Sequence, residues 1–245
     1  MISNFQNKVV LITGATNGIG KEILEAFLKT KAIIIATGNS TTKKNFFKIY
    51  KKNEIDYYQT DFNDEKSSKD FLKKIQNYKK IDVCINNAGI NKINYIGKIS
   101  NEFDDLLNVN LKIPFQITSV VSNIMKKNKY GKIINISSIW GKKSKEKRIS
   151  YSTSKYALNG LTVSSSIELA KYNILVNSIS PGFVDTKLTR KILSKKEINQ
   201  IKKQIPIGRL AKPSEIVPLI LFLCSDLNTY ITGQIIYVDG GFINV

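Results

Sequence analysis

A glycine-rich turn between two apolar segments is the feature that most restricts how this chain can fold. Residues 8–13 form a short, apolar, β-branched run, which is typical of a buried strand. Three glycines, Gly14, Gly18 and Gly20, follow at once, and residues 21–30 show the apolar periodicity of a helix. A strand, a tight turn and a helix in this order predict the opening half of a βαβ unit.

The same turn has a chemical use. Glycine lets the backbone turn sharply and lets a pyrophosphate approach the helix N-terminus, where free N–H groups and the helix dipole favour anions. The alternative is a glycine-rich turn that binds no ligand. The strand before it and the helix after it favour a dinucleotide site. The spacing is Gly-x-x-x-Gly-x-Gly, which differs from the more common Gly-x-Gly-x-x-Gly.

The end of the second predicted strand, residues 32–36, bears on the choice of dinucleotide. An acidic residue about 20 positions after the glycine turn normally accepts the ribose 2′-hydroxyl of NAD. Between Glu25 and Glu54 the chain has no acidic residue. Polar and basic residues that could hold a 2′-phosphate stand there instead: Thr37, Asn39, Ser40, Lys43 and Lys44. We therefore predict that NADP(H) is favoured over NAD(H).

Strands and helices alternate along the rest of the chain. Apolar runs predict strands at residues 55–59, 82–85, 132–136, 173–180 and 234–238, and helical patterns cover residues 41–53, 100–127 and 213–226. No repeat or linker divides the chain. We predict an α/β fold, a single Rossmann domain over residues 1–245 with a doubly wound parallel sheet of about seven strands and helices on both faces. Residues 183–212 are a candidate mobile substrate lid, because the stretch at residues 183–204 is polar and rich in lysine.

Tyr151 and Lys155 are the candidate proton donor and its partner. The chain contains no histidine, the usual residue for proton transfer near neutral pH. Residues four apart share one helix face. Free tyrosine keeps its proton up to a pH of about 10, and a lysine cation in a partly desolvated pocket lowers that pKa. Alone, such a pair is more often a solvated helix surface, but beside a dinucleotide site it predicts acid–base chemistry.

Other polar residues follow predicted strands, and ligands of open α/β sheets bind at the carboxyl ends of strands. Asp61 could bond an adenine amino group, or cap the helix that begins near Asp64. Asn86-Asn87-Ala88-Gly89 could pack against a cofactor and could also anchor the glycine turn. Ser138 could donate to a substrate oxygen, although a Ser-Ser pair is more often a turn or a cap.

Asn110 and Pro114 lie in the long helical region predicted at residues 100–127. A polar asparagine inside an apolar helix is most often a satisfied buried amide. Proline removes a backbone donor, so we expect the helix hydrogen bonds to be disturbed near this point.

A formal charge of +19 raises the possibility of nucleic-acid binding. The lysines are spread over every predicted helix and loop, so the charge favours no single binding face, and we expect no nucleic-acid partner. The basic segment at residues 142–148 lies between Ser138 and Tyr151. Such a run is usually solvated surface, and here the alternative is that it steers an acidic substrate.

The remaining composition bears on location and metals. No apolar run approaches the ~20 residues that span a bilayer, and the N-terminus lacks the pattern of a signal peptide. Cys84 and Cys224 lie in apolar segments and are expected to be buried thiols in a reducing cytoplasm. Without histidine or paired cysteines, we expect no metal site.

The sequence resembles the short-chain dehydrogenase/reductase family over its whole length. The likeness rests on residues 13–20, on residues 86–89, on Ser138, Tyr151 and Lys155 at family spacing, and on Pro181-Gly182 and the segment ending in Val238-Asp239-Gly240-Gly241. The resemblance implies that the catalytic residues are Asn110, Ser138, Tyr151 and Lys155. It implies that the cofactor-binding residues are Gly14, Thr16, Asn17, Gly18, Ile19, Gly20, Thr37, Asp61, Phe62, Asn86, Asn87, Ala88, Gly89, Tyr151, Lys155, Pro181, Gly182, Val184 and Thr186.

Within that family the chain is most similar to bacterial 3-oxoacyl-[acyl-carrier-protein] reductases. This implies NADPH-dependent reduction of a ketone to a secondary alcohol in fatty acid synthesis, a homotetramer or dimer, and acyl carrier protein as a partner. Asn17 stands where those reductases commonly carry arginine, and Lys129 and Lys171 stand where arginines dock the carrier. Residues 144–148 also resemble reductases of surface-sugar biosynthesis, so a sugar or another small carbonyl compound is the alternative substrate. A non-catalytic, cofactor-binding scaffold is the alternative of a different class.

Overall fold

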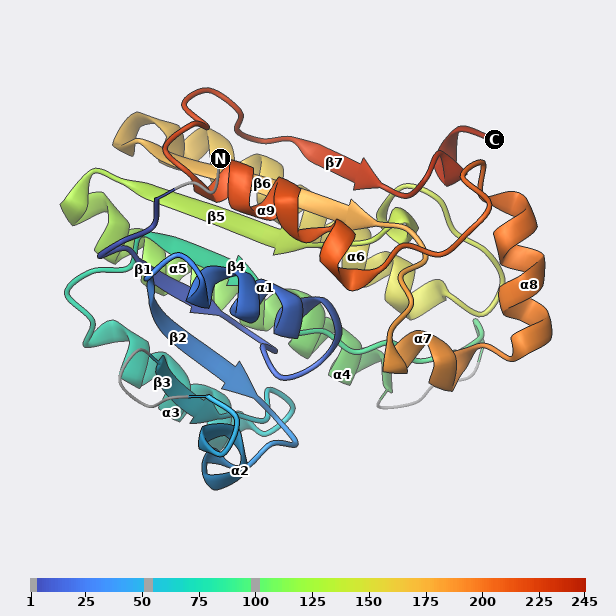
Figure 1. Cartoon of the computed structure of the whole chain (residues 1–245), viewed down its shortest axis with the longest axis horizontal. Helices are drawn as coiled ribbons and strands as arrows, with labels where there is room; N and C mark the ends of the chain where they lie inside the picture. Colours follow the sequence, from blue (N-terminus) through green and yellow to red (C-terminus); the bar gives the residue numbers. More distant parts are fainter. Residues whose placement is uncertain (1–3, 51–54, 98–101) are drawn as a thin grey trace.

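A seven-stranded sheet runs through the centre of the molecule. The computed structural model describes residues 4–50, 55–97 and 102–245. Its strands lie in the order β3-β2-β1-β4-β5-β6-β7 and every neighbouring pair is parallel (Figure 1). The strands are β1 (Val9–Ile12), β2 (Ile33–Gly38), β3 (Ile55–Gln59), β4 (Val83–Asn86), β5 (Gly131–Ile136), β6 (Ile174–Pro181) and β7 (Ile235–Val238). The strand order reverses between β1 and β4, so the predicted doubly wound α/β fold is confirmed.

Helices cover both faces of the sheet. They are α1 (Gly18–Leu28), α2 (Lys43–Phe47), α3 (Glu65–Gln76), α4 (Glu102–Leu107), α5 (Ile113–Asn128), α6 (Ile149–Leu169), α7 (Lys187–Ile192), α8 (Lys195–Gln204) and α9 (Val217–Cys224). None of the described helices is long and apolar enough to cross a membrane.

Alternate residues of β1 pack into two separate apolar cores, one on each face of the sheet, because successive side chains of a strand point to opposite faces. Val10 packs in one core with Phe27 of α1 and with α9, and Leu11 packs in the other with Phe71 of α3 and with α5. Burial on both faces explains the uninterrupted apolar runs of the strands. The two predicted buried thiols lie in this interior, one in each core.

The long helical region predicted at residues 100–127 is divided. Between α4 and α5, Asn108–Lys112 form a π-helical segment, and Pro114 lies in the first turn of α5, where a proline fits. The predicted helix at residues 41–53 is shorter in the structure, since α2 covers Lys43–Phe47, and residues 51–54 lie outside the described residues. The region predicted at residues 213–226 is a 3₁₀ turn followed by α9.

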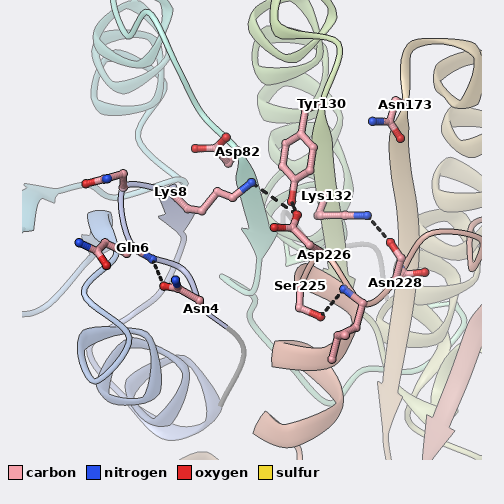
Figure 2. A network of polar contacts seen from close by, with 12 residues as sticks. Asn4, Gln6, Lys8, Asp82, Tyr130, Lys132, Asn173, Ser225, Asp226 and Asn228 are labelled. Carbon is pink, nitrogen blue, oxygen red and sulfur yellow. Dashed lines mark hydrogen bonds and ion pairs between the residues drawn. The ribbon is translucent and has the colours of Figure 1, made fainter. Parts of the chain in front are cut away.

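A polar network fastens the segment after α9 to the amino end of the sheet (Figure 2). The Lys132 ammonium, on β5 and buried, donates to the backbone oxygen of Asn228. The Tyr130 hydroxyl donates to Asp226 over 2.7 Å, and the Lys8 ammonium lies 3.5 Å from the same carboxylate. Burial lowers the pKa of Lys132, which shows that its charge is held at a cost. These contacts hold the segment after α9 against the amino ends of β1 and β5.

The carboxyl ends of the strands lie on the opposite side of the molecule from the polar network around Asp226. In Figure 1 the arrowheads of β4, β5, β6 and β7 point toward the side of the molecule where α7 and α8 lie. The turns after β1, β4, β5 and β6 therefore meet at one edge, with α7 beyond them, and that edge carries the candidate site.

Candidate active site

The glycine turn after β1 is held by Thr37 at the end of β2. The Gly14 amide donates to the Thr37 hydroxyl over 3.2 Å, and the Ala15 amide donates to the Thr37 carbonyl over 2.7 Å. Gly14 and Gly18 have φ angles of +65° and +54°, in the region that glycine adopts without strain. The Thr37 hydroxyl is thus engaged by the turn, and we assign it an anchoring role.

A second set of hydrogen bonds joins β1 to β4. The Thr13 hydroxyl accepts from the amides of Asn87 and Ala88 over 3.0 and 2.9 Å. The Asn87 side chain donates to the carbonyls of Thr13 and Gly14 over 2.9 and 3.0 Å. The prediction that this asparagine segment anchors the first turn is confirmed for Asn87. Asn86 faces the interior instead, where its amide donates to Asn135 over 2.8 Å.

Gly20 is required by close packing. A Cβ added at Gly20 would lie 2.1 Å from the Gly14 oxygen and 2.4 Å from the amide nitrogen of Asn87. Any side chain here would push α1 away from the turn. Gly20 therefore supports the glycine turn by close packing and does not itself line the cleft.

A cavity of about 420 Å³ opens above these turns. Most predicted site residues line it: Gly14, Thr16, Asn17, Gly18, Ile19, Thr37, Asp61, Phe62, Asn87, Ala88, Gly89, Ser138, Tyr151, Lys155, Pro181, Gly182, Val184 and Thr186. Gly20, Asn86 and Asn110 were predicted with them, but the structure places these three outside the lining, because each packs against turns or helices beneath the surface.

The cavity fits a dinucleotide. Its floor is the turn at the N-terminus of α1, which no side chain caps, so its backbone N–H groups are available to an anion. Among the described residues that line it, Asp61 is the only acid, while Lys155, Arg148 and Lys187 are basic. Asn39 and Ser40 line the end next to β2, whereas Lys43 and Lys44 are exposed on α2 and do not line it.

Asp61 does not cap the helix that follows. Asp64 is the N-cap of α3 and accepts from the Ser67 amide over 2.6 Å, so the capping alternative is wrong for Asp61. One Asp61 carboxylate oxygen accepts from the Asn63 amide over 2.9 Å. Asp61 and Phe62 remain at the cleft, where contact with an adenine ring stays a prediction.

Tyr151 stands on α6 next to Ser138 at the end of β5. Burial raises the pKa of Tyr151 above its ordinary value, while a hydrogen bond from Ser138 and the positive charge of Arg148 act to lower it. The net direction is upward, so the phenol keeps its proton at neutral pH. We expected Lys155 to lower this pKa, and in the structure Ser138 and Arg148 take that role.

Lys155 is buried one helical turn further along α6. Its ammonium donates to the Ile136 carbonyl over 2.9 Å and lies 5.7 Å from the centre of the Tyr151 ring. Burial lowers the pKa of Lys155 to about 8. A Cβ added at Gly89 would lie 3.3 Å from the Asn110 side-chain oxygen and 3.8 Å from the Lys155 nitrogen, so the turn after β4 passes close to both side chains.

Asn110 lies in the π-helical segment and is fully buried. Its side chain accepts from the Ile90 amide and donates to the Ile90 carbonyl, both over 2.9 Å, and it also donates to Ser154 over 3.1 Å. These bonds link the segment after β4 to α6. π-helical turns often mark functional sites, because they redirect one side chain. The water chain implied for Asn110 stays a prediction.

The segment after β6 covers one side of the cleft. Thr186 begins α7 and its methyl group would be 3.4 Å from a Cβ placed at Gly18, so α7 approaches the glycine turn. Ile201, Ile205 and Leu210 form a small core of their own with Phe183 and its neighbours. The segment is therefore positioned as a cover, while its mobility stays a prediction.

Sequence reasoning treated residues 142–148 as one basic run, and the structure divides it. Lys142, Lys145 and Lys147 are exposed, whereas Arg148 is 5% exposed and lines the cavity. An Arg148 N–H donates to the Asn91 side chain over 3.1 Å. The only feature of the sequence that could have distinguished Arg148 from the lysines before it is its position three residues before Tyr151.

A glycine turn at the switch point of a parallel sheet, with a serine, a tyrosine and a lysine meeting above it, defines an NAD(P)-dependent oxidoreductase. A family model described as "Enoyl-(Acyl carrier protein) reductase" matches residues 14–243. The chain belongs to the short-chain dehydrogenase/reductase family.

Curated relatives match along almost the whole chain. The 3-oxoacyl-[acyl-carrier-protein] reductase FabG of Thermotoga maritima is 38% identical over 97% of this chain and 98% of its own length. The enzyme of the same name from Escherichia coli is 33% identical over 99% and 100%.

Solved structures show the same fold. One described as an NAD(P)-dependent gluconate 5-dehydrogenase from Beutenbergia cavernae with bound NADP has a TM-score of 0.92 at 27% identity, covering 99% of each chain. A 4-hydroxyisoleucine dehydrogenase complexed with NADH has a TM-score of 0.90 at 32% identity, covering 98% of this chain and 100% of its own. ElxO with NADP bound has a TM-score of 0.88 at 29% identity, covering the same shares.

The contacts of Gly20 predict the effect of an added methyl group. Gly20→Ala should lower the free energy of unfolding by about 1–3 kcal/mol, because the methyl group meets a backbone oxygen that cannot move aside. It should also weaken NADPH binding, since the turn must shift. Gly160→Ala is the matched control, because nothing lies within 4 Å of its added Cβ on α6. That variant should gain up to about 1 kcal/mol. Urea unfolding and NADPH fluorescence titration measure both, and equal effects of the two variants would contradict the packing role of Gly20.

The buried ammonium of Lys155 predicts a pH-dependent stability. Below pH 8 the folded and unfolded chains both carry this proton. As the pH rises from about 8 toward the ordinary value of 10.5, the folded protein loses the proton first, so the free energy of unfolding rises. Relative to Lys155→Met, the unmodified protein should gain about 3 kcal/mol over that interval. Urea unfolding at pH 7 to 10 measures the difference. Lys203→Met removes an exposed ammonium and is the control, and a constant difference for both variants would refute the prediction.

Proposed function

We propose that this protein reduces a ketone to a secondary alcohol with NADPH, and that its first candidate substrate is a 3-oxoacyl group carried as a thioester on acyl carrier protein. The observation that supports the reaction is the meeting of Ser138, Tyr151 and Lys155 at one cleft above the glycine turn. The support for the substrate is similarity to the Thermotoga and Escherichia 3-oxoacyl reductases over nearly their whole length.

The nicotinamide, when bound, supplies a hydride to the carbonyl carbon. Ser138 then stabilises the negative charge that develops on the carbonyl oxygen by donating a hydrogen bond, and Tyr151 donates the proton that completes the alcohol. A raised pKa suits this role, because the phenol holds its proton until a strong base forms next to it. Lys155 places its positive charge beside the reacting groups and would hold the ribose of the bound cofactor.

The preference for NADPH follows from the charge at the end of β2. A carboxylate there would bind a ribose 2′-hydroxyl and repel a 2′-phosphate. Asn39 and Ser40 line the cleft at this place, and neither carries a negative charge. The exposed lysines of α2 add a positive potential nearby. NADPH therefore meets no repulsion that would favour NADH.

A second candidate substrate is a small ketone or alcohol that bears a carboxylate. Two of the similar solved structures are a gluconate 5-dehydrogenase and a 4-hydroxyisoleucine dehydrogenase, whose named substrates are carboxylic acids. The observation in this chain that favours such a substrate is the buried Arg148 in the cavity wall.

Removing the Tyr151 hydroxyl tests the mechanism. Tyr151→Phe should lower kcat by roughly 10²–10⁴, the usual size of a general-acid contribution, and leave NADPH binding intact. Tyr156→Phe is the matched control, because it removes a phenol hydroxyl from an exposed site on the same helix. Stopped-flow NADPH oxidation measures both. Near-normal turnover of Tyr151→Phe would remove the proposed role.

A substrate panel tests the assignment. With acetoacetyl-acyl-carrier-protein, kcat/KM should be higher for NADPH than for NADH by roughly tenfold or more, as one retained phosphate contact implies. Keto-sugars and 5-oxogluconate, which carry a reducible ketone, serve as comparison substrates. A clear preference for NADH would overturn the cofactor proposal, and faster turnover of 5-oxogluconate or a keto-sugar than of the thioester would overturn the first candidate substrate.

A further inference from the structure

Arg148 is a buried cation in the wall of the reaction cleft that no described acidic side chain neutralises. We propose that its guanidinium binds a carboxylate of the substrate, and that this contact selects keto acids or hydroxy acids over uncharged ketones. This role rests on the reduction proposed above, and it favours the second candidate substrate over the carrier-bound thioester, which is uncharged next to its ketone.

Burial is the first support. Arg148 is 5% exposed, and its side chain has one hydrogen bond within the described protein, to the neutral amide of Asn91. No ion pair joins it to any acid in the described part of the chain. Glu197 acts on its charge from a distance, but that carboxylate is engaged by Ser194 at the start of α8. A guanidinium has five N–H donors, so most of its binding capacity is left for a ligand.

The position of Arg148 in the fold is the second support. It is the N-cap of α6, a helix of 21 residues, and its side chain makes no capping bond. The N-terminus of a helix carries a partial positive charge, which disfavours a cation and favours an anion. Desolvation also acts against the charge and lowers the pKa of the group. Both the helix dipole and burial therefore disfavour the positive charge of Arg148. A cation at such a site is expected where a ligand supplies the opposite charge.

The place of Arg148 beside the reacting groups is the third support. Arg148 immediately precedes α6, three residues before Tyr151, and its positive charge acts on the Tyr151 phenol. Both line the same cavity. A carbonyl oxygen that meets Tyr151 would therefore bring a group one or two carbons away within reach of the guanidinium. The planar fork of arginine matches the two oxygens of a carboxylate.

The phosphates of the cofactor have a separate place. The pyrophosphate would bind at the turn of Gly14 and Gly18, and the 2′-phosphate would lie near Asn39 and Ser40 at the end of β2. Arg148 instead bonds Asn91 and pairs through its backbone with Asn94, both in the segment after β4. The guanidinium is thus left for the substrate.

The experiment compares keto acids with their methyl esters, which keep the skeleton and remove the charge. Acetoacetate and 4-oxopentanoate, each with its ester, are reduced by the NADPH-loaded protein, and kcat/KM is measured for each. The unmodified protein should prefer the acid of at least one pair by about 10²-fold, the size expected for a charged hydrogen-bonded contact. An unmodified protein that prefers both esters overturns the proposal without any variant.

Three variants assign the preference to one residue. In Arg148→Gln the acid-to-ester ratio should fall by about 10²-fold, and in Arg148→Lys, which keeps the charge but loses the fork, it should fall by less. Lys145→Gln removes an equal charge from an exposed position in the same loop and should change the ratio less than about twofold, as expected for a screened surface charge. An equal fall of the ratio in Lys145→Gln would show that the net charge of the loop sets the preference, and it would overturn the proposal. An unchanged ratio in an Arg148→Gln variant that still binds NADPH would also overturn it, because Arg148 would then have no part in the preference.

A binding measurement separates this proposal from the proposed reaction. Succinate is not a ketone, so calorimetric titration of succinate into the NADPH-loaded protein reports the anion site alone. Binding that is lost in Arg148→Gln supports the site even if no ketone in the panel is reduced, in which case only the reaction proposal fails. Binding that is equal in the unmodified protein and in Arg148→Gln overturns the site.

Discussion

The hydrogen bonds between Thr13, Gly14 and Asn87 are the constraint on which the site depends. They bring the ends of β1 and β4 together where the strand order reverses, and they leave no room for a side chain at Gly20. Because both partners are backbone and short side chains, the geometry of the turn has little freedom. The cleft above it exists because the chain leaves β1 and β4 in opposite directions from this point.

Charge inside the cleft is the second determinant of function. Lys155 and Arg148 are both buried, and Tyr151 lies between them on α6. Burial acts against each charge, lowering the pKa of both basic groups and raising that of the phenol. Such opposed shifts in one cavity are typical of a reaction site, because the bound cofactor and substrate supply the compensating charge.

Much of this arrangement is predictable from local sequence pattern. The apolar runs predict the strands to within two residues, because β-branched segments buried on both faces need no partner information to be recognised. The glycines predict the turn, because few other residues accept its φ angles. Neighbouring positions were harder. Asn86 and Asn87 were predicted together, but Asn86 is the last residue of β4 and bonds Asn135 in the interior, whereas Asn87 lies after the strand and holds the turn.

The sequence by itself determined the order of strands and helices along the chain, the glycine turn and the spacing of Ser138, Tyr151 and Lys155. Each of these depends on residues that are close in the chain. Only the tertiary structure decided that Arg148 is buried while the lysines before it are exposed, that Asn110 lies in a π-helical segment behind the cleft, and that burial raises the pKa of Tyr151. Burial and electrostatic environment are set by segments far apart in sequence, and no local pattern carries that information.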